Sequence, residues 1–277
     1  MCNKECTNDV EPAIYNHLLP ADDQRDRLDV VLVSPRNPLN IGAVARAMAN
    51  FGFARLAVVA PYEPHWREAR SAVEAEDVLR DARVCATLAE VVADCTLVVG
   101  TGTLTYRRPE QPVVRLPELA PLVRRELERG GRVAMIFGPE KHGLTREDLA
   151  HCHVLVEIPT DARQPSMNLG QAVAVCLYEL ASRAFAAHAG AAAAEAAESE
   201  EPGARSAELE RLAGVVEETM LAAGYRPHTM EAANRHDLRV LLRRLSLSAA
   251  DTRRTLGLFR RILWRLRPTP DVRPGRD

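Results

Sequence analysis

The sequence predicts an α/β fold with a parallel sheet covered on both faces, followed by a small all-α carboxyl-terminal domain. Two observations carry this prediction. Between residues 28 and 187, short apolar runs alternate with helical patterns, which is typical of parallel strands joined by crossover helices. After an acidic, alanine-rich segment, the chain resumes with helical patterns rich in arginine. The 277 residues, 47% of them hydrophobic, are enough for one ordinary core and a small second one.

Strands and helices are expected in alternation along the α/β region. Strands are expected at 29–34, 55–60, 95–101, 132–138 and 153–159. Helices are expected at 40–51, 68–81, 87–93, 117–129, 145–150 and 168–187. Ligands of such folds bind beyond the carboxyl ends of the strands, so we expect the site in the loops after Gly100, Phe137 and Ile158.

The chain is expected to divide into five parts. They are a disordered tail at 1–27, the α/β domain at 28–187, an acidic Ala/Glu-rich linker at 188–205, a basic helical extension at 206–268 and a tail at 269–277. The linker is low in complexity and has no large side chain that could anchor a core.

Several classes of protein are excluded by what the sequence lacks. No apolar run is long enough to span a bilayer, and the polar start has no hydrophobic signal region, so we expect a cytoplasmic protein. The six cysteines form no CxxC pair, which favours reduced thiols. No metal is expected at His151–His153, because adjacent side chains on an extended chain point to opposite faces. GxGxxG after a strand and GxxxxGK[ST] are both absent, which argues against dinucleotide and P-loop sites.

The extension carries an excess of positive charge. Residues 226–268 hold eleven arginines against three acids, interleaved with aromatic residues such as Phe259 and Trp264. This pattern is typical of a domain that binds a polyanion such as nucleic acid. The alternative is a general coding bias toward arginine, since only two of the 36 basic residues are lysines.

Four segments resemble the signature regions of a known family. They are NPLNIGAVARAMANFGF at 37–53, VVGTGT at 98–103, IFGPEKHGLTREDLAHCH at 136–153 and IPTDARQPSMNLGQAVAVCLYEL at 158–180. In order and spacing they resemble the SPOUT RNA 2'-O-methyltransferases of the TrmH superfamily. The basic extension, with LFRRIL at 258–263, resembles that of the TrmJ branch, whose members methylate a ribose in the tRNA anticodon loop.

The resemblance implies a SPOUT fold whose carboxyl-terminal segment forms a deep trefoil knot, here between about residues 133 and 178. In the family this knot holds S-adenosylmethionine (SAM). The implied cofactor residues are Thr101, Gly102, Thr103, Gly138, Ile158, Ser166, Met167 and Leu169. The resemblance also implies a homodimer formed through the apolar helix at 168–187. The alternative for that helix is burial within one chain.

Five residues match the family's catalytic motifs: Arg46, Asn40, Glu140, Ser166 and Asn168. Arginine stays protonated in proteins, so we expect Arg46 to stabilise the developing 2'-alkoxide and an adjacent phosphate rather than act as a simple base. An exposed helix arginine without a function is the alternative. Asn40 could instead cap the helix, and Glu140 is expected to pair with a basic loop residue.

Two departures from the family pattern affect the substrate loop. Pro165 stands where many members have a small polar residue, and Tyr106 lies near the position of an arginine in TrmJ-like chains. Arg107 or Arg108 is therefore expected to contact RNA instead. The expected RNA contacts are Arg36, Arg107, Arg108, Arg243, Arg244, Arg260 and Arg261.

The function implied by the resemblance is SAM-dependent ribose 2'-O-methylation of tRNA, at the pyrimidine (cytidine or uridine) at nucleotide 32 of the anticodon loop. A ribose in an unpaired loop can enter a deep pocket more readily than one in a helix. Two alternatives remain, namely the same chemistry on ribosomal RNA and an RNA-binding dimer without activity. The presence of Arg46, Asn40 and Ser166 argues against the inactive dimer.

Overall fold

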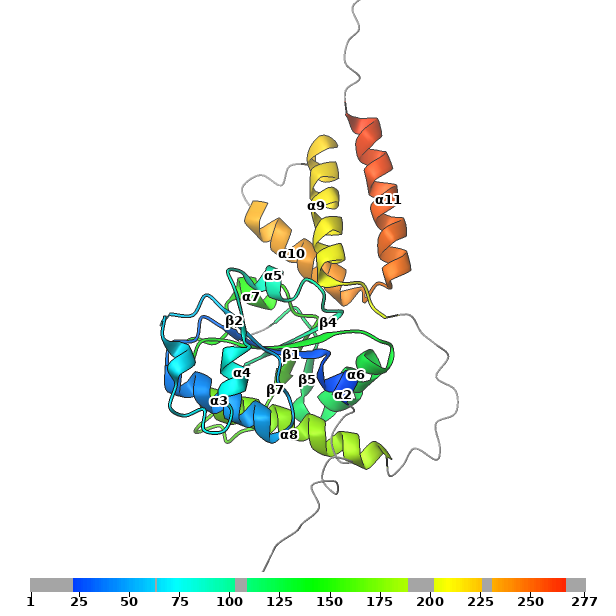
Figure 1. Cartoon of the computed structure of the whole chain (residues 1–277). Helices are drawn as coiled ribbons and strands as arrows, with labels where there is room; N and C mark the ends of the chain where they lie inside the picture. Colours follow the sequence, from blue (N-terminus) through cyan, green and yellow to red (C-terminus); the bar gives the residue numbers. More distant parts are fainter. Residues whose placement is uncertain (1–21, 63, 103–108, 189–201, 226–230, 268–277) are drawn as a thin grey trace, which may run out of the picture.

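A computed structural model describes residues 22–62, 64–102, 109–188, 202–225 and 231–267 (Figure 1). Seven strands form one sheet in the order β3-β2-β1-β6-β4-β7-β5, and every neighbouring pair is parallel. The strands are β1 (Leu28–Val33), β2 (Leu56–Val59), β3 (Arg83–Cys85), β4 (Leu97–Thr101), β5 (Val113–Arg115), β6 (Val133–Phe137) and β7 (Val154–Glu157). The α/β class expected from the sequence is confirmed.

Helices cover both faces of this sheet. They are α2 (Asp22–Arg25), α3 (Pro38–Asn50), α4 (Glu76–Arg80), α5 (Leu88–Val91), α6 (Leu116–Glu128), α7 (Arg146–Leu149) and α8 (Leu169–His188), with a 3-10 turn, η1 (Trp66–Glu68). All of β1 is buried, and its side chains alternate between two cores. Val30 and Leu32 belong to the core that contains α3, α6 and α8, whereas Val31 and Val33 belong to the core that contains α5 and α7. Figure 1 shows α3 and α8 on one side of the sheet and α5 and α7 on the other.

The elements differ from the expected ones in three places. Strands β3 and β5 were not expected, because each has only three residues and stands at an edge of the sheet with exposed positions. The helix expected at 68–81 is divided into η1 and α4, and Glu74, with φ of 61°, interrupts it. The tail expected to be disordered at 1–27 contains α2, so its boundary is corrected for residues 22–27. Residues 1–21 lie outside the described ranges.

Three helices form the extension: α9 (Ser206–Ala222), α10 (Glu231–Arg244) and α11 (Ala249–Leu266). Leu212, Ala213 and Leu242 are the buried centre of a small core between them. Most of the expected linker, 189–201, lies outside the described residues. Its end is packed, because Ala204 is 2% exposed and donates its N–H to the carbonyl of Leu247.

The extension is attached to the loops that precede β4 and β7. The N–H and the hydroxyl of Ser206 donate to the carbonyl of Cys95, at 2.9 and 3.1 Å. From α10, the Arg243 Nε donates to the carbonyl of His151 at 3.0 Å. These bonds fix the extension to the α/β domain of its own chain, at the edge of the sheet where the strands begin.

Four cysteines in the described part of the chain, Cys85, Cys95, Cys152 and Cys176, are free and buried. Burial raises the pKa of Cys95, Cys152 and Cys176 to about 12, so these thiols are protonated and unreactive at neutral pH. No helix within the described ranges has both the length and the apolar composition of a membrane span.

Candidate active site

A cavity of about 800 Å³ opens at the carboxyl edge of the sheet, where the loops after β4, β6 and β7 meet the start of α8. This volume suits a small organic molecule. The lining includes seven of the eight residues expected to hold the cofactor: Thr101, Gly102, Gly138, Ile158, Ser166, Met167 and Leu169. The eighth, Thr103, lies outside the described residues. Parallel strands bring their carboxyl ends to one edge, which is why motifs separated in the sequence share this cavity.

Backbone groups form one wall of the cavity. A Cβ atom at Gly138 would lie 2.3 Å from the backbone of Gly143 and Leu144, so only glycine allows this turn to close. Gly143 has φ of +64°, and its N–H donates to the carbonyl of Pro139 at 2.8 Å. A Cβ atom at Gly102, by contrast, would meet no atom of the described residues within 4 Å, and this residue borders the open space of the cavity.

A chain of side-chain hydrogen bonds joins three of the motifs beside the cavity. Asn40 Nδ2 donates to Glu140 Oε1 at 2.9 Å, and Asn168 Nδ2 donates to Asn40 Oδ1 at 2.9 Å. Asn168 Oδ1 in turn accepts the N–H of Gly170 at the start of α8, at 2.9 Å. The network therefore holds together α3, the turn after β6 and the loop before α8.

Glu140 is the anionic centre of this network. Its two oxygens also accept the backbone N–H groups of Arg36 and Asn37, each at 3.3 Å. Burial by itself would raise the pKa of Glu140, but the hydrogen bonds from Asn40 and from the backbone amides outweigh it and hold the pKa below its usual value. Glu140 is therefore ionised at neutral pH and fixes the loop that leads into α3.

The structure bears on one expectation and one alternative for these residues. Among the described residues, Glu140 pairs with no basic side chain and accepts the backbone amide of Arg36 rather than its guanidinium, whereas the loop arginines Arg107 and Arg108 lie outside those residues. Asn40 is not the helix cap, because α3 begins two residues earlier at Pro38 and its cap is Asn37, whose side chain accepts the N–H of Leu39 at 3.0 Å. Proline suits the first position of a helix because its missing N–H would have no acceptor there.

Arg46 lies on α3 and is exposed. It makes no hydrogen bond or ion pair with any residue that the structure describes, and it does not line the cavity. Six positions separate it from Asn40, so the two side chains leave the helix in directions about 120° apart. The structure thus places Arg46 on the same rigid helix as Asn40 but outside the hydrogen-bonded network, with its guanidinium available to a ligand.

Ser166 is exposed at the mouth of the cavity, in the loop before α8. The same loop is braced by Thr160, whose hydroxyl donates to the carbonyl of Pro165 at 3.1 Å. Pro165, noted as a departure from the family pattern, itself lines the cavity. Its position means that the departure affects the shape of the pocket as well as the substrate loop.

Six of the seven residues expected to contact RNA fall into three groups. Arg244, Arg260 and Arg261 are exposed on α10 and α11, as RNA contacts require. Arg36 is exposed, and its guanidinium lies 5.5 Å from the ring centre of Tyr62, an exposed aromatic residue that the sequence analysis did not single out. Arg107 and Arg108, with Tyr106, lie outside the described residues.

The position of Arg243 contradicts the prediction that this residue contacts RNA. Its side chain is 1% exposed and lies between α9, α10 and the α/β domain. Nη2 donates to Glu210 at 3.0 Å and Nε donates to the carbonyl of His151. Burial lowers the pKa of Arg243, while the carboxylate of Glu210 opposes that effect. The residue holds the extension in place and has no surface for a phosphate.

The two histidines of the HCH segment, His151 and His153, contact neighbouring parts of the fold. His153 Nδ1 accepts the N–H of Val98 at 3.1 Å, and burial lowers its pKa to about 3. Burial, reinforced by Arg243, lowers the pKa of His151 to about 4. Within the described ranges, the one group with metal-ligand spacing is Glu110, His236 and Asp237. Arg146 pairs with both carboxylates there, at 3.2 and 3.4 Å, and so supplies the positive charge that a cation would bring.

Known proteins are similar to this chain over the domain that contains the cavity. The model of the SpoU rRNA Methylase family matches residues 27–178, which include every wall of the cavity. A tRNA (cytidine/uridine/adenosine-2'-O-)-methyltransferase TrmJ from Pseudomonas aeruginosa is 42% identical over 156 residues, which are 56% of this chain and 60% of the relative. The matched part of that relative is therefore less than two thirds of its length.

Two further similarities extend into the helical extension. A tRNA (cytidine/uridine-2'-O-)-methyltransferase TrmJ from Pectobacterium atrosepticum is 33% identical over 250 residues, covering 89% of this chain and 99% of the relative. The crystal structure of TrmJ from Z. mobilis ZM4 superposes with a TM-score of 0.72 at 31% identity, covering 84% of this chain and 98% of that one. The chain therefore belongs to the SpoU methylase family, in the branch that contains the TrmJ proteins.

Proposed function

We propose that the protein is a SAM-dependent tRNA ribose 2'-O-methyltransferase. The observation that carries the proposal is the cavity at the carboxyl edge, whose lining coincides with the cofactor residues of the family motifs and adjoins the network of Asn40, Glu140 and Asn168. The relatives that match most of their own length are named tRNA 2'-O-methyltransferases. We also infer that the segment at 133–178 forms the trefoil knot of the family.

The cavity suits SAM in size and in the chemistry of its walls. Backbone groups at Gly102, Gly138 and Ile158 can hold the adenine and the amino-acid end, while Leu144 and Leu169 supply apolar contacts. The close approach of backbone at Gly138 makes a narrow wall that any side chain would obstruct. When bound, SAM supplies the methyl group on a positively charged sulfur.

The residues around the cavity have separate tasks in this reaction. The ribose 2'-oxygen gains the methyl group and its proton passes to solvent water, so negative charge develops on that oxygen during the transfer. Arg46, exposed and without a partner in the described part of the chain, supplies positive charge for this oxygen and for the adjacent phosphate. Glu140 and Asn40 keep the start of α3 in place, and α3 carries Arg46.

The substrate is taken to be tRNA, modified at the pyrimidine at nucleotide 32 of the anticodon loop. The exposed arginines of α10 and α11 give the extension a surface that suits a folded RNA extending away from the modified ribose. The exposed pair of Arg36 and Tyr62, next to the loop that Glu140 holds, offers a guanidinium and an aromatic ring to an unpaired nucleotide.

A homodimer through α8 is part of the proposal. One side of this helix is buried, at Val173, Cys176 and Leu177. On the other side, Tyr178 is 58% exposed, and the centre of its ring lies 6.1 Å from the centre of the Phe51 ring. An exposed aromatic residue on a mostly apolar helix suits contact with a second copy of the chain. Sedimentation of the purified protein tests this part.

The function is tested by incubating the full chain with SAM and either tRNA or ribosomal RNA, followed by mass spectrometric mapping of 2'-O-methylated nucleosides. Methylation of the anticodon loop at nucleotide 32 supports the proposal. Methylation of ribosomal RNA alone would favour the second candidate, a ribosomal RNA 2'-O-methyltransferase. The description of the matching family as an rRNA methylase supports that candidate. Binding of either RNA without methyl transfer would favour an inactive RNA-binding protein.

A further inference from the structure

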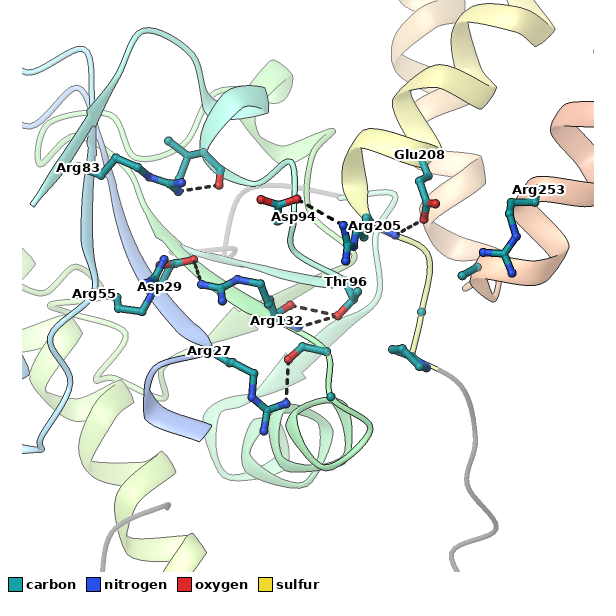
Figure 2. A pocket seen from close by; sticks show the side chains of 16 residues that line it. Arg27, Asp29, Arg55, Arg83, Asp94, Thr96, Arg132, Arg205, Glu208 and Arg253 are labelled. Carbon is teal, nitrogen blue, oxygen red and sulfur yellow. Dashed lines mark hydrogen bonds and ion pairs between the residues drawn. The ribbon is translucent and has the colours of Figure 1, made fainter. Parts of the chain in front are cut away.

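A second cavity, of about 710 Å³, lies between the α/β domain and the first turns of α9 and α11 (Figure 2). Its charged lining consists of six arginines, Arg27, Arg55, Arg83, Arg132, Arg205 and Arg253, and three carboxylates, Asp29, Asp94 and Glu208. Most of the lining from the α/β domain stands just before a strand or at its start. The cavity is therefore at the opposite edge of the sheet from the candidate active site, and it has an excess of positive charge.

Asp29 orients the arginines on the inner wall. Its carboxylate is 6% exposed and accepts Arg55 Nε at 2.7 Å and Arg132 Nη2 at 3.4 Å. Two guanidiniums thus share one carboxylate, which leaves a net positive charge. The side chains of Arg55 and Arg132 stay 41% and 29% exposed, so their remaining N–H donors are accessible from the cavity.

The outer wall comes from the extension. Arg205 Nη1 is 3.8 Å from Asp94, beyond hydrogen-bond distance, and its side chain is 64% exposed. Arg253 is exposed and has no hydrogen bond or ion pair with another residue in the described ranges. A bridge between Gly203 and Ser248 sets the starts of α9 and α11 side by side, so the positive ends of two long helices lie at this cavity.

A stripe of exposed side chains continues from the cavity along α11. Arg253, Arg260 and Trp264 follow one another at spacings of seven and four positions, which places them on one face of the helix, and all three are exposed. Arginines interleaved with an aromatic ring suit the phosphates and bases of a nucleic acid. The cavity is therefore the inner end of a basic surface, rather than an isolated cluster.

We propose that this cavity binds a backbone phosphate of the RNA substrate and anchors the RNA at the edge of the sheet opposite the reaction. The inference rests on the proposed function, because it takes RNA as the substrate. Guanidiniums form paired, charge-assisted hydrogen bonds with phosphate oxygens. Arginines of both domains line this one space, and two of them, Arg27 and Arg83, also donate to the backbone carbonyls of Leu127 and Val91 (Figure 2). A phosphate in this place links the extension to the α/β domain, so RNA binding favours the docked position of the extension.

The test compares single substitutions in the full chain by fluorescence anisotropy with a labelled tRNA transcript. Arg253→Gln removes a cavity donor that has no partner in the described ranges, so no carboxylate is left unpaired there. Arg254→Gln, one residue later on α11 and outside the cavity lining, is the matched control. A double variant, Arg205→Gln with Arg253→Gln, tests both sides of the outer wall. Unchanged SAM affinity and melting temperature show that each variant is folded.

We expect Arg253→Gln to weaken tRNA binding about 10-fold and the double variant to weaken it further, because each loses charge-assisted hydrogen bonds. Each lost phosphate contact also lowers the log–log salt slope by roughly 0.7–0.9. Arg254→Gln is expected to change affinity about twofold at most, as one surface charge does. Equal losses in Arg253→Gln and Arg254→Gln would overturn the inference in favour of a diffuse electrostatic surface.

Three further outcomes would overturn the inference. If pyrophosphate stabilises the wild type but not the double variant, while tRNA affinity is equal in both, the cavity takes a free phosphate compound and the RNA anchor is wrong. If the wild type neither binds nor methylates tRNA, the proposed function fails and the anchor fails with it. Normal methylation with tRNA affinity unchanged in the double variant would refute the anchor alone.

Discussion

The side-chain amide of Asn40 donates a 2.9 Å hydrogen bond to the carboxylate of Glu140, a hundred positions later in the chain. This bond joins the first turn of α3 to the turn after β6. Because Glu140 also accepts two backbone amides of the loop before α3, the carboxylate fixes both the loop and the helix. The helix that carries Arg46 is thereby held against the edge of the cavity where the methyl transfer is proposed.

Glu140→Gln is expected to slow methyl transfer about 10-fold or more. The substituted amide has one acceptor oxygen in place of two, so a backbone N–H at 36 or 37 loses its partner at a cost of about 1–3 kcal/mol. Single-turnover transfer of labelled methyl groups to tRNA measures the effect. Glu147→Gln, an exposed glutamate in the same motif, is the control, and equal rates in the two variants would contradict the role given to Glu140.

Arg46→Ala is expected to lower the rate of methyl transfer about 100-fold or more while leaving SAM affinity within about twofold, because its proposed work is on the oxygen and phosphate of the RNA. The control is Arg80→Ala, which removes an exposed arginine on α4. Arg46→Lys separates two roles. Partial activity would indicate that positive charge is what the reaction requires, and no activity would indicate that it requires the paired N–H donors of the guanidinium. Wild-type rates in Arg46→Ala would show that this arginine has no part in catalysis.

Arg243→Ala is expected to reduce the free energy of unfolding by about 2 kcal/mol, because it leaves the carbonyl of His151 without its side-chain donor and removes one of the two arginines that pair with Glu210, the other being Arg239. Urea denaturation followed by circular dichroism measures this change. The adjacent residue provides the comparison, since Arg244 is exposed and Arg244→Ala is expected to change stability by less than about 0.5 kcal/mol. Similar stabilities for both variants would mean that the buried contact does not hold the extension.

Acid is expected to destabilise the fold through the two buried histidines. Both have a folded pKa below the ordinary value of 6.5, at about 4 for His151 and about 3 for His153. The unfolded chain therefore binds more protons as the pH falls below 6.5, and stability decreases from that pH down toward the folded pKa values.

His153→Asn isolates one of these contributions. The asparagine oxygen can accept the N–H of Val98 in place of Nδ1, and it does not titrate. The free energy of unfolding should then fall less steeply between pH 6 and pH 4, by up to about 1.4 kcal/mol per unit for one fully buried histidine. An unaltered slope in denaturation curves across this range would show that His153 does not contribute.

Much of the α/β domain can be predicted from the sequence, because parallel strands buried on both faces are continuous apolar runs. β1 and β6 are such runs and match the expected segments to within a residue or two. β3 and β5 escape this reasoning because three residues with exposed positions carry no apolar pattern. The break in the helix at 68–81 depends on the backbone of Glu74, a residue type that ordinarily continues a helix.

The candidate site could be predicted where sequence motifs specify the side chains. It could not be predicted where tertiary packing determines which groups are in contact. The residues expected to bind the cofactor gather because the strands that precede them are parallel neighbours. The partners of Glu140 are backbone amides, which leave no trace in residue types. Arg243 and Arg244 are indistinguishable in the sequence, and only the docking of α10 on the α/β domain buries the first and exposes the second.

The central claim is that the cavity at the carboxyl edge of the sheet binds SAM, and calorimetry on Gly102→Phe tests it most directly. A side chain at this position meets no atom of the described residues within 4 Å of its Cβ, so the variant should fold normally while its ring fills the cavity. Gly214→Phe, at an equally open glycine on α9, is the matched control. We predict that the wild type and Gly214→Phe bind SAM with equal affinity and that Gly102→Phe, with an unchanged melting temperature, binds none. Wild-type affinity in Gly102→Phe would contradict the account.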